Sequence, residues 1–234
     1  MPAPPKMHTT RDLVGTAGPL LLDAMRRIAA DRGRCRLGLS GGRTPGPLFD
    51  WMADNVPPEL SEQLWITWID ERHLPVDREE VPFWRGYPHG ANVRLAFERW
   101  LARNRAGWVQ PMIAGRSLEE DLLWFHKRFE SEFDGALDVV LLGAGADGHI
   151  ASLFPGHPAL SAEGLAVAVT DAPGEYSNRI SLSLPVLQDV DLAVLIAQEE
   201  GKTAALQAAM SGDQSLPLGR YAPRGEYHWV IERP

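Results

Sequence analysis

The residue best suited to chemistry is His149, which lies in the segment Asp147-Gly148-His149-Ile150-Ala151-Ser152-Leu153-Phe154-Pro155-Gly156. This segment directly follows an apolar run at residues 137–143 that is typical of a buried strand. Functional groups in open α/β sheets gather where strands end at their carboxyl termini. Because a neutral imidazole can take a proton from water at neutral pH, we predict that His149 is a general base.

Two other roles for this segment are less well supported by its spacing. Asp147 and His149 could contribute to a metal site, but such sites need three or four converging ligands, and no His-x-x-x-His spacing accompanies the pair. His157 follows a Pro-Gly pair and is expected to be a loop residue. Ser152 lacks the Gly-x-Ser-x-Gly elbow of a nucleophile, so we expect a structural or helix-capping hydroxyl. The sequence therefore predicts a base that works without a metal.

A glycine turn and two distant cations are candidates for binding a phosphate. The turn Ser40-Gly41-Gly42-Arg43-Thr44-Pro45 joins a predicted strand at 35–39 to a predicted helix at 45–53. Its backbone N–H groups could face one anion, although the turn lacks the lysine of a P-loop and the spacing of a dinucleotide fingerprint. Arg179 opens a predicted strand at 179–184, and Lys202 opens a predicted helix at 202–210. The turn could instead be only a tight connection, and Arg179 and Lys202 could be only solvated charges. Taken together, however, the three features could converge on one phosphate.

Asp70-Glu71-Arg72 follows a predicted strand at 65–69. The simple interpretation is a surface ion pair. The alternative is that Asp70 or Arg72 points toward the His149 loop and orients a catalytic group or binds an anion of the substrate. An irregular stretch at 73–90 and a helix at 92–103 are predicted to follow. A loop of this length is usually functional or mobile.

The elements that must position these residues alternate between strand and helix. A helix is predicted at 12–31, and Ser117-Leu118-Glu119-Glu120 has the form of a capping box before another helix. Further strands are predicted at 165–169, 192–197 and 227–231. This alternation favours an α/β fold with a mostly parallel sheet covered on both faces. No linker divides residues 1–234, so we expect a single domain.

The composition limits which classes of binding partner and which cellular compartment we expect. The formal net charge of −8 disfavours nonspecific binding to nucleic acid or to an anionic membrane surface. Cys35 is the only cysteine, which excludes an intrachain disulfide and indicates a reducing compartment. The start of the chain lacks the apolar stretch of a signal peptide, and no segment approaches the length of a membrane span. We expect a cytoplasmic protein.

Five segments, in this order, resemble the 6-phosphogluconolactonase family. They are Ser-Gly-Gly-Arg-Thr-Pro at 40–45, Asp-Glu-Arg at 70–72, the ten residues at 147–156, Arg-Ile-Ser-Leu-Ser-Leu-Pro at 179–185 and Gly-Lys-Thr-Ala-Ala-Leu at 201–206. The glucosamine-6-phosphate deaminases of the wider superfamily share the glycine turn and the histidine loop. They typically continue with Ala-Phe-Asn-Glu-Pro-Gly, whereas this chain has Ala-Ser-Leu-Phe-Pro-Gly and lacks the acidic residue.

The resemblance implies a Rossmann-like three-layer α/β/α domain that hydrolyses 6-phosphogluconolactone in the oxidative pentose phosphate pathway, with no cofactor and no metal. It makes His149 the base and places Asp70, Arg72 and Asp147 around it. It assigns the phosphate to Arg179, Lys202 and the turn residues Ser40, Gly41, Gly42, Arg43 and Thr44. The expected partner is the small sugar phosphate lactone, and the expected state is a monomer or weak homodimer.

Two departures from the family pattern leave questions open. Ile150 stands where the lactonases commonly have Thr, and Asn92-Val93-Arg94 stands where Ser-Asn-Tyr-Arg is usual, so the role of Arg94 is open.

Two other functions also remain. One is an aldose–ketose isomerase-deaminase for an amino sugar phosphate. The other is a noncatalytic sugar-phosphate sensor, but such modules usually carry a DNA-binding domain, for which the chain has no basic helix pair and no room.

Overall fold

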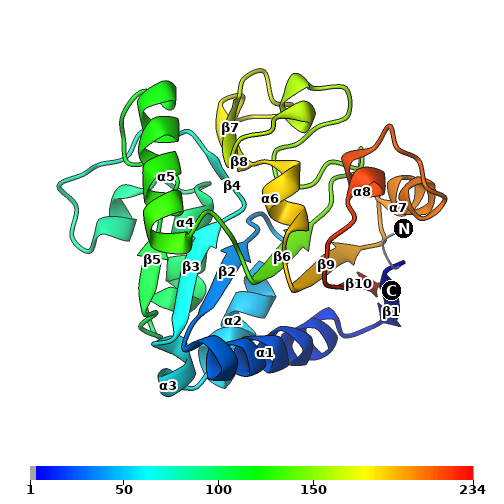
Figure 1. Cartoon of the computed structure of the whole chain (residues 1–234), viewed down its shortest axis with the longest axis horizontal. Coiled ribbons are helices and arrows are strands. Elements are labelled where there is room, and N and C mark those ends of the chain that lie inside the picture. Colours follow the sequence, from blue (N-terminus) through cyan, green and yellow to red (C-terminus); the bar gives the residue numbers. More distant parts are fainter. Residues whose placement is uncertain (1–3, 234) are drawn as a thin grey trace.

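A seven-stranded parallel sheet forms the centre of the computed structural model, which describes residues 4–233 (Figure 1). The strand order is β1-β10-β9-β6-β2-β3-β5. The strands are β1 (Lys6–Thr10), β2 (Cys35–Leu39), β3 (Leu64–Trp68), β5 (Trp108–Gln110), β6 (Val139–Gly143), β9 (Leu192–Gln198) and β10 (Glu226–Glu232). The central strands are buried on both faces, which is why they have continuous apolar sequences. This sheet confirms the predicted α/β class.

Helices flank the sheet. The longest, α1 (Leu13–Arg32), packs against β2, β6, β9 and β10. Gly18 of α1 touches Trp51 of α2, since a Cβ at residue 18 would lie 2.7 Å from the indole ring. The missing side chain therefore lets the two helices meet. The remaining helices are α2 (Gly46–Asn55), α3 (Pro58–Ser61), α4 (Asn92–Ala96), α5 (Leu118–Phe133), α6 (Leu184–Gln188), α7 (Thr203–Met210) and α8 (Pro217–Arg220), with η1 (Phe83–Gly86), η2 (Phe97–Leu101) and η3 (Pro158–Ser161).

A second, antiparallel sheet was not predicted. It contains β4 (Asp70–Arg72), β8 (Arg179–Leu182) and β7 (Ala166–Val169), in that order. The segments 165–169 and 179–184, which were predicted as strands, lie in this small sheet and not in the parallel one. After β3 the chain passes through buried Ile69, whose carbonyl accepts a hydrogen bond of 2.8 Å from Leu182 N–H, and enters the small sheet at once. The strand predicted at 179–184 ends at Leu182, because Leu184 begins α6 with Pro185 in its first turn.

Most predicted elements are present. The capping box of α5 is formed, since Ser117 Oγ accepts from Glu120 N–H and the Glu120 carboxylate accepts from Ser117 N–H. The predicted helix at 92–103 is present as α4 followed by the π-helical turn η2. The edge strands β1 and β5 were missed, because half-exposed edge strands have no continuous apolar run. None of the helices within residues 4–233 is long and apolar enough to cross a membrane.

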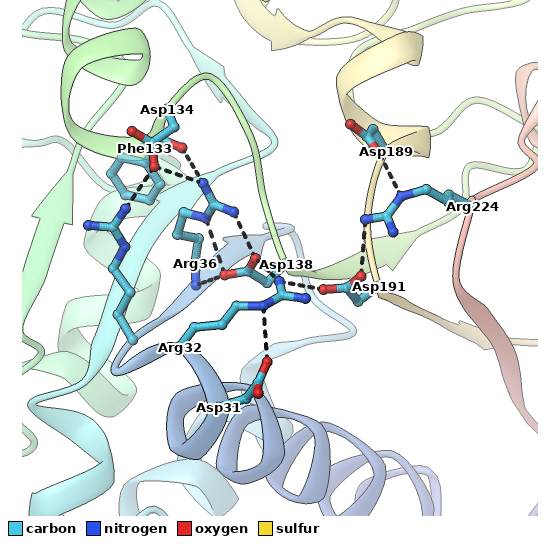
Figure 2. Close-up of polar contacts among 10 residues, drawn as sticks. Asp31, Arg32, Arg36, Phe133, Asp134, Asp138, Asp189, Asp191 and Arg224 are labelled. Atoms are coloured by element: carbon cyan, nitrogen blue, oxygen red, sulfur yellow. Dashed lines mark hydrogen bonds and ion pairs between the residues drawn. The ribbon is translucent and has the colours of Figure 1, made fainter.

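An ion-pair network holds the amino ends of β2, β6 and β9 together (Figure 2). At its centre, buried Asp138 accepts from the backbone N–H of Arg36 at 2.7 Å and from the Arg32 guanidinium at 2.7 Å. Asp191 extends the network from Arg32 to Arg224. Asp138 precedes β6 and the His149 loop follows it, so the network lies at the end of the strand opposite that loop. It stabilises the sheet away from the predicted site.

Candidate active site

A cavity of about 210 Å³ opens beyond the carboxyl ends of β2 and β6. Ten of the predicted site residues line it, from five separate segments: Ser40, Gly41, Gly42, Arg43, Thr44, Asp70, Arg72, His149, Arg179 and Lys202. The other lining residues are Pro45, Asn92, Gly143, Ala144 and Ala151. Asp147 is the one predicted site residue outside the lining. The fold thus brings the predicted residues together around one space.

Asp147 is hydrogen-bonded to His149. Its Oδ1 atom is 2.6 Å from His149 Nδ1 and also accepts from the His149 backbone N–H at 3.2 Å. With the Nδ1 proton directed at this carboxylate, Nε2 is left as the proton acceptor. Gly145 makes the pair possible, because a Cβ at this position would lie 2.1 Å from His149 Nδ1. Of the carboxylates Asp70 and Asp147, it is therefore Asp147 that bonds to the imidazole.

Asp70 contacts the His149 loop through a serine. Its Oδ2 atom accepts a bond of 2.7 Å from the hydroxyl of Ser152, which is fully buried. Its other oxygen lies 3.5 Å from Nδ2 of Asn92. Ser152 caps no helix, and its backbone N–H donates to Ser181 Oγ at 3.2 Å. Ser152 is thus a structural hydroxyl that ties the histidine loop to the small sheet.

Two arginines face each other across the small sheet. Arg72 of β4 is paired in register with Arg179 of β8. Arg72 donates to the carbonyl of Gly90, and Arg179 donates to the carbonyl of Tyr176 at 2.9 Å. Burial lowers the pKa of Arg179, the positive charge of Arg72 lowers it further, and Asp70 opposes both effects. Because like charges on directly opposed residues are destabilising, this wall of the cavity is suited to an anion.

The glycine turn and Lys202 form a second cationic part of the lining. Gly42 has a φ of +89°, which favours glycine. Gly41 is required for another reason, since a Cβ there would lie 1.8 Å from Oδ1 of buried Asn92. Lys202 immediately precedes α7, and burial followed by the charge of Arg43 lowers its pKa. Phosphate binding by these groups stays a prediction, but their placement around one cavity is compatible with it.

Glu71 is a supporting residue that sequence reasoning missed. Its carboxylate is fully buried and accepts from the backbone N–H groups of Arg72, Asn92 and Val93, each at 2.8 Å. Burial raises the pKa of Glu71 to about 7, against the effect of these hydrogen bonds. Glu71 therefore fixes the start of α4, and with it Asn92, to the strand that contains Asp70. No spacing in the sequence links residue 71 to residue 92, so only the structure could reveal the contact.

Of the residues that depart from the family pattern, Asn92 lines the cavity, whereas Ile150 and Arg94 lie outside its lining. Arg94 donates to Glu98 at 2.7 Å and to the carbonyls of Arg85 and Tyr87, so it braces the preceding loop. Ile150 is fully buried, and its carbonyl accepts from Leu153 N–H. His157 caps η3, as expected of a loop residue. Within residues 4–233, no group of three or more His, Cys, Asp or Glu side chains is arranged to hold a metal ion.

Comparison with known proteins gives one family. The family model "Glucosamine-6-phosphate isomerases/6-phosphogluconolactonase" matches residues 8–229. A 6-phosphogluconolactonase of Mycobacterium tuberculosis is 30% identical over 94% of this chain and 92% of its own length, and one of Rattus norvegicus is 30% identical over 88% of this chain and 80% of its own. The crystal structure of a 6-phosphogluconolactonase from Shewanella baltica superimposes with a TM-score of 0.83 at 23% identity, covering 99% of both chains. The chain therefore belongs to the glucosamine-6-phosphate isomerase/6-phosphogluconolactonase family.

Proposed function

We propose that the chain hydrolyses 6-phospho-D-glucono-1,5-lactone to 6-phospho-D-gluconate in the cytoplasm, as a step of the oxidative pentose phosphate pathway. The observation that carries this proposal is the His149–Asp147 pair at the edge of a cavity that is also lined by Arg72, Arg179 and Lys202. An oriented imidazole supplies a base, and the cations suit a substrate that carries a phosphate. The names of the relatives point to the same reaction.

The reaction begins when Nε2 of His149 removes a proton from water as the water oxygen attacks C1 of the lactone. The carbonyl of a δ-lactone is electrophilic enough that no covalent enzyme intermediate is needed. Cations or backbone amides of the cavity stabilise the negative charge that develops on the carbonyl oxygen. When the tetrahedral intermediate collapses, the bond between C1 and the ring oxygen breaks, and the imidazolium returns its proton to that oxygen. The carboxylic acid product then ionises, so each turnover releases one proton to the solvent.

The far end of the substrate is held by its phosphate. Arg179, Lys202 and the turn at Gly41 and Gly42 would bind this group and so place C1 beside the water near His149. Asp147 keeps the imidazole in position and stabilises its positive charge after proton transfer. Asp70 and Arg72 shape the wall next to the histidine loop.

Proton release tests this proposal. We expect freshly generated 6-phosphogluconolactone to acidify a weakly buffered solution faster with the protein than by its spontaneous hydrolysis. His149→Ala should lower kcat by about 10²- to 10⁴-fold, the usual contribution of a general base, with an unchanged melting temperature. Near-normal kcat in the folded variant would exclude His149 as the base. Release of ammonia from glucosamine 6-phosphate, without lactone hydrolysis, would instead identify a deaminase.

A further inference from the structure

The aromatic ring of Phe154 contacts both the His149 imidazole and the Arg179 guanidinium. Its centroid is 4.6 Å from the centroid of the His149 imidazole, with the two planes tilted by 50°. The guanidinium carbon of Arg179 lies 5.4 Å from the centroid of the same ring. Phe154 is only 4% exposed and is absent from the cavity lining, so it acts on these residues rather than on a ligand.

Both neighbours are groups that an aromatic face attracts when they are positive. Arg179 is permanently charged and half-buried. Its donors are directed at the backbone carbonyls of Tyr176 and Pro173 and, at 3.5 Å, at the hydroxyl of Ser152. The imidazole of His149 is neutral before the reaction and positive after it has removed a proton from water. The face of a phenyl ring carries negative electrostatic potential, and its attraction for a cation is stronger where water is excluded.

We propose that Phe154 is a positioning residue with two tasks in the lactone hydrolysis proposed above, on which this inference rests. Its ring holds the Arg179 guanidinium toward the phosphate. The same ring stabilises the imidazolium of His149, which forms only as the reaction proceeds. An aliphatic side chain of similar size would fill the space but could do neither. Cation–π attraction of the usual strength corresponds to a loss of about 2- to 30-fold in kcat when the ring is replaced.

A graded series of ring substitutions separates this role from simple packing. Phenylalanine analogues with one, two and three ring fluorines, incorporated at position 154, weaken the negative face of the ring with little change in shape. We expect log kcat to fall stepwise with the number of fluorines, and KM for the phospholactone to rise in parallel. Phe154→Leu should lie at or beyond the end of this series.

Phe129 offers a matched control. It too is a buried phenylalanine, and it stacks on Phe125 and Phe133 at centroid distances of 5.4 and 5.5 Å, outside the cavity lining. The same fluorinated series at position 129 should leave kcat and KM unchanged. Equal kcat across the series at position 154, in proteins that keep the wild-type melting temperature, would overturn the proposal.

Binding of inorganic phosphate distinguishes failure of this inference from failure of the proposed function. If the wild-type protein does not accelerate lactone hydrolysis, the proposed function is wrong. Calorimetric titration of the wild type and the fluorinated variants with inorganic phosphate then tests whether Phe154 positions Arg179. A dissociation constant that rises with each fluorine supports that contact, and one that stays constant across the series rejects it.

Discussion

Replacing Asp147 with alanine tests whether this carboxylate orients the base. In the structure its Oδ1 atom is 2.6 Å from His149 Nδ1 and 3.2 Å from the His149 backbone N–H. Without it, the imidazole loses the acceptor that holds the proton on Nδ1, and the imidazolium formed during the reaction loses its nearest negative charge. The variant keeps the base itself, so we expect a partial loss of activity.

The size of this loss can be estimated from the contact. A hydrogen bond to a charged group contributes roughly 1.5–3 kcal/mol, which corresponds to about 10- to 150-fold in rate. The side chains of His149 and Asp147 are 30% and 46% exposed, so water screens the charge, and the lower part of this range applies. We expect kcat to fall about 10- to 30-fold in Asp147→Ala. KM should stay near its wild-type value, because the predicted phosphate-binding groups are elsewhere.

The assay is the initial rate of proton release from freshly generated 6-phosphogluconolactone, corrected for spontaneous hydrolysis. Asp70→Asn is the comparison, because Asp70 bonds to Ser152 and Asn92 rather than to His149. It should reduce kcat less than Asp147→Ala does. A kcat within about twofold of wild type for Asp147→Ala would refute the reasoning. A loss confined to Asp70→Asn would assign the orientation of His149 to Asp70.

Four other outcomes are expected. Lys202→Ala should raise KM for the phospholactone by roughly 10- to 150-fold and hardly affect unphosphorylated gluconolactone, since one charge-assisted contact is lost; an equal loss on both lactones would show that Lys202 does not bind the phosphate. Burial raises the pKa of Glu71 to about 7, so the folded protein binds a proton at this carboxylate more tightly than the unfolded chain does. The unfolding free energy of the wild type, measured relative to that of Glu71→Gln, should therefore fall by about 3 kcal/mol as pH rises from about 4.5 to 7. A difference between the two proteins that does not change with pH would contradict this. Asp138→Ala should cost about 3 kcal/mol of unfolding free energy in urea, because the mostly buried Arg36 loses its buried partner and keeps only the exposed Asp134 and the carbonyl of Phe133. Asp31→Ala, which removes a carboxylate that is 78% exposed, should cost under about 1 kcal/mol. Chelation followed by desalting should leave activity unchanged; activity that returned only with a divalent ion would require a metal-dependent mechanism.

The sequence by itself determined the features that short segments encode. The apolar run at 137–143, the glycine turn at 40–45 and the capping box at Ser117 each predicted a local structure that is present. Strand–helix alternation predicted the parallel sheet, and in such a sheet all strands end at one edge. For this reason the candidate residues after β2, β3, β6 and β9 could be placed near one another without any knowledge of strand order.

Only the tertiary structure decided which of these residues touch. Arg72 faces Arg179 because the chain leaves the main sheet after β3 and pairs antiparallel with β8, a register that no local pattern specifies. Asp147 rather than Asp70 bonds to His149 because Gly145 leaves room for the pair, while Ser152 takes the Asp70 carboxylate. The contacts of Phe154 with His149 and Arg179 also require the loop and the small sheet to meet. The Arg72–Arg179, Asp70–Ser152 and Phe154–Arg179 contacts join segments that are distant in the chain. Even the local Asp147–His149 contact depends on the backbone path of its loop. Packing and backbone direction decide these contacts, and residue types and spacing do not encode them.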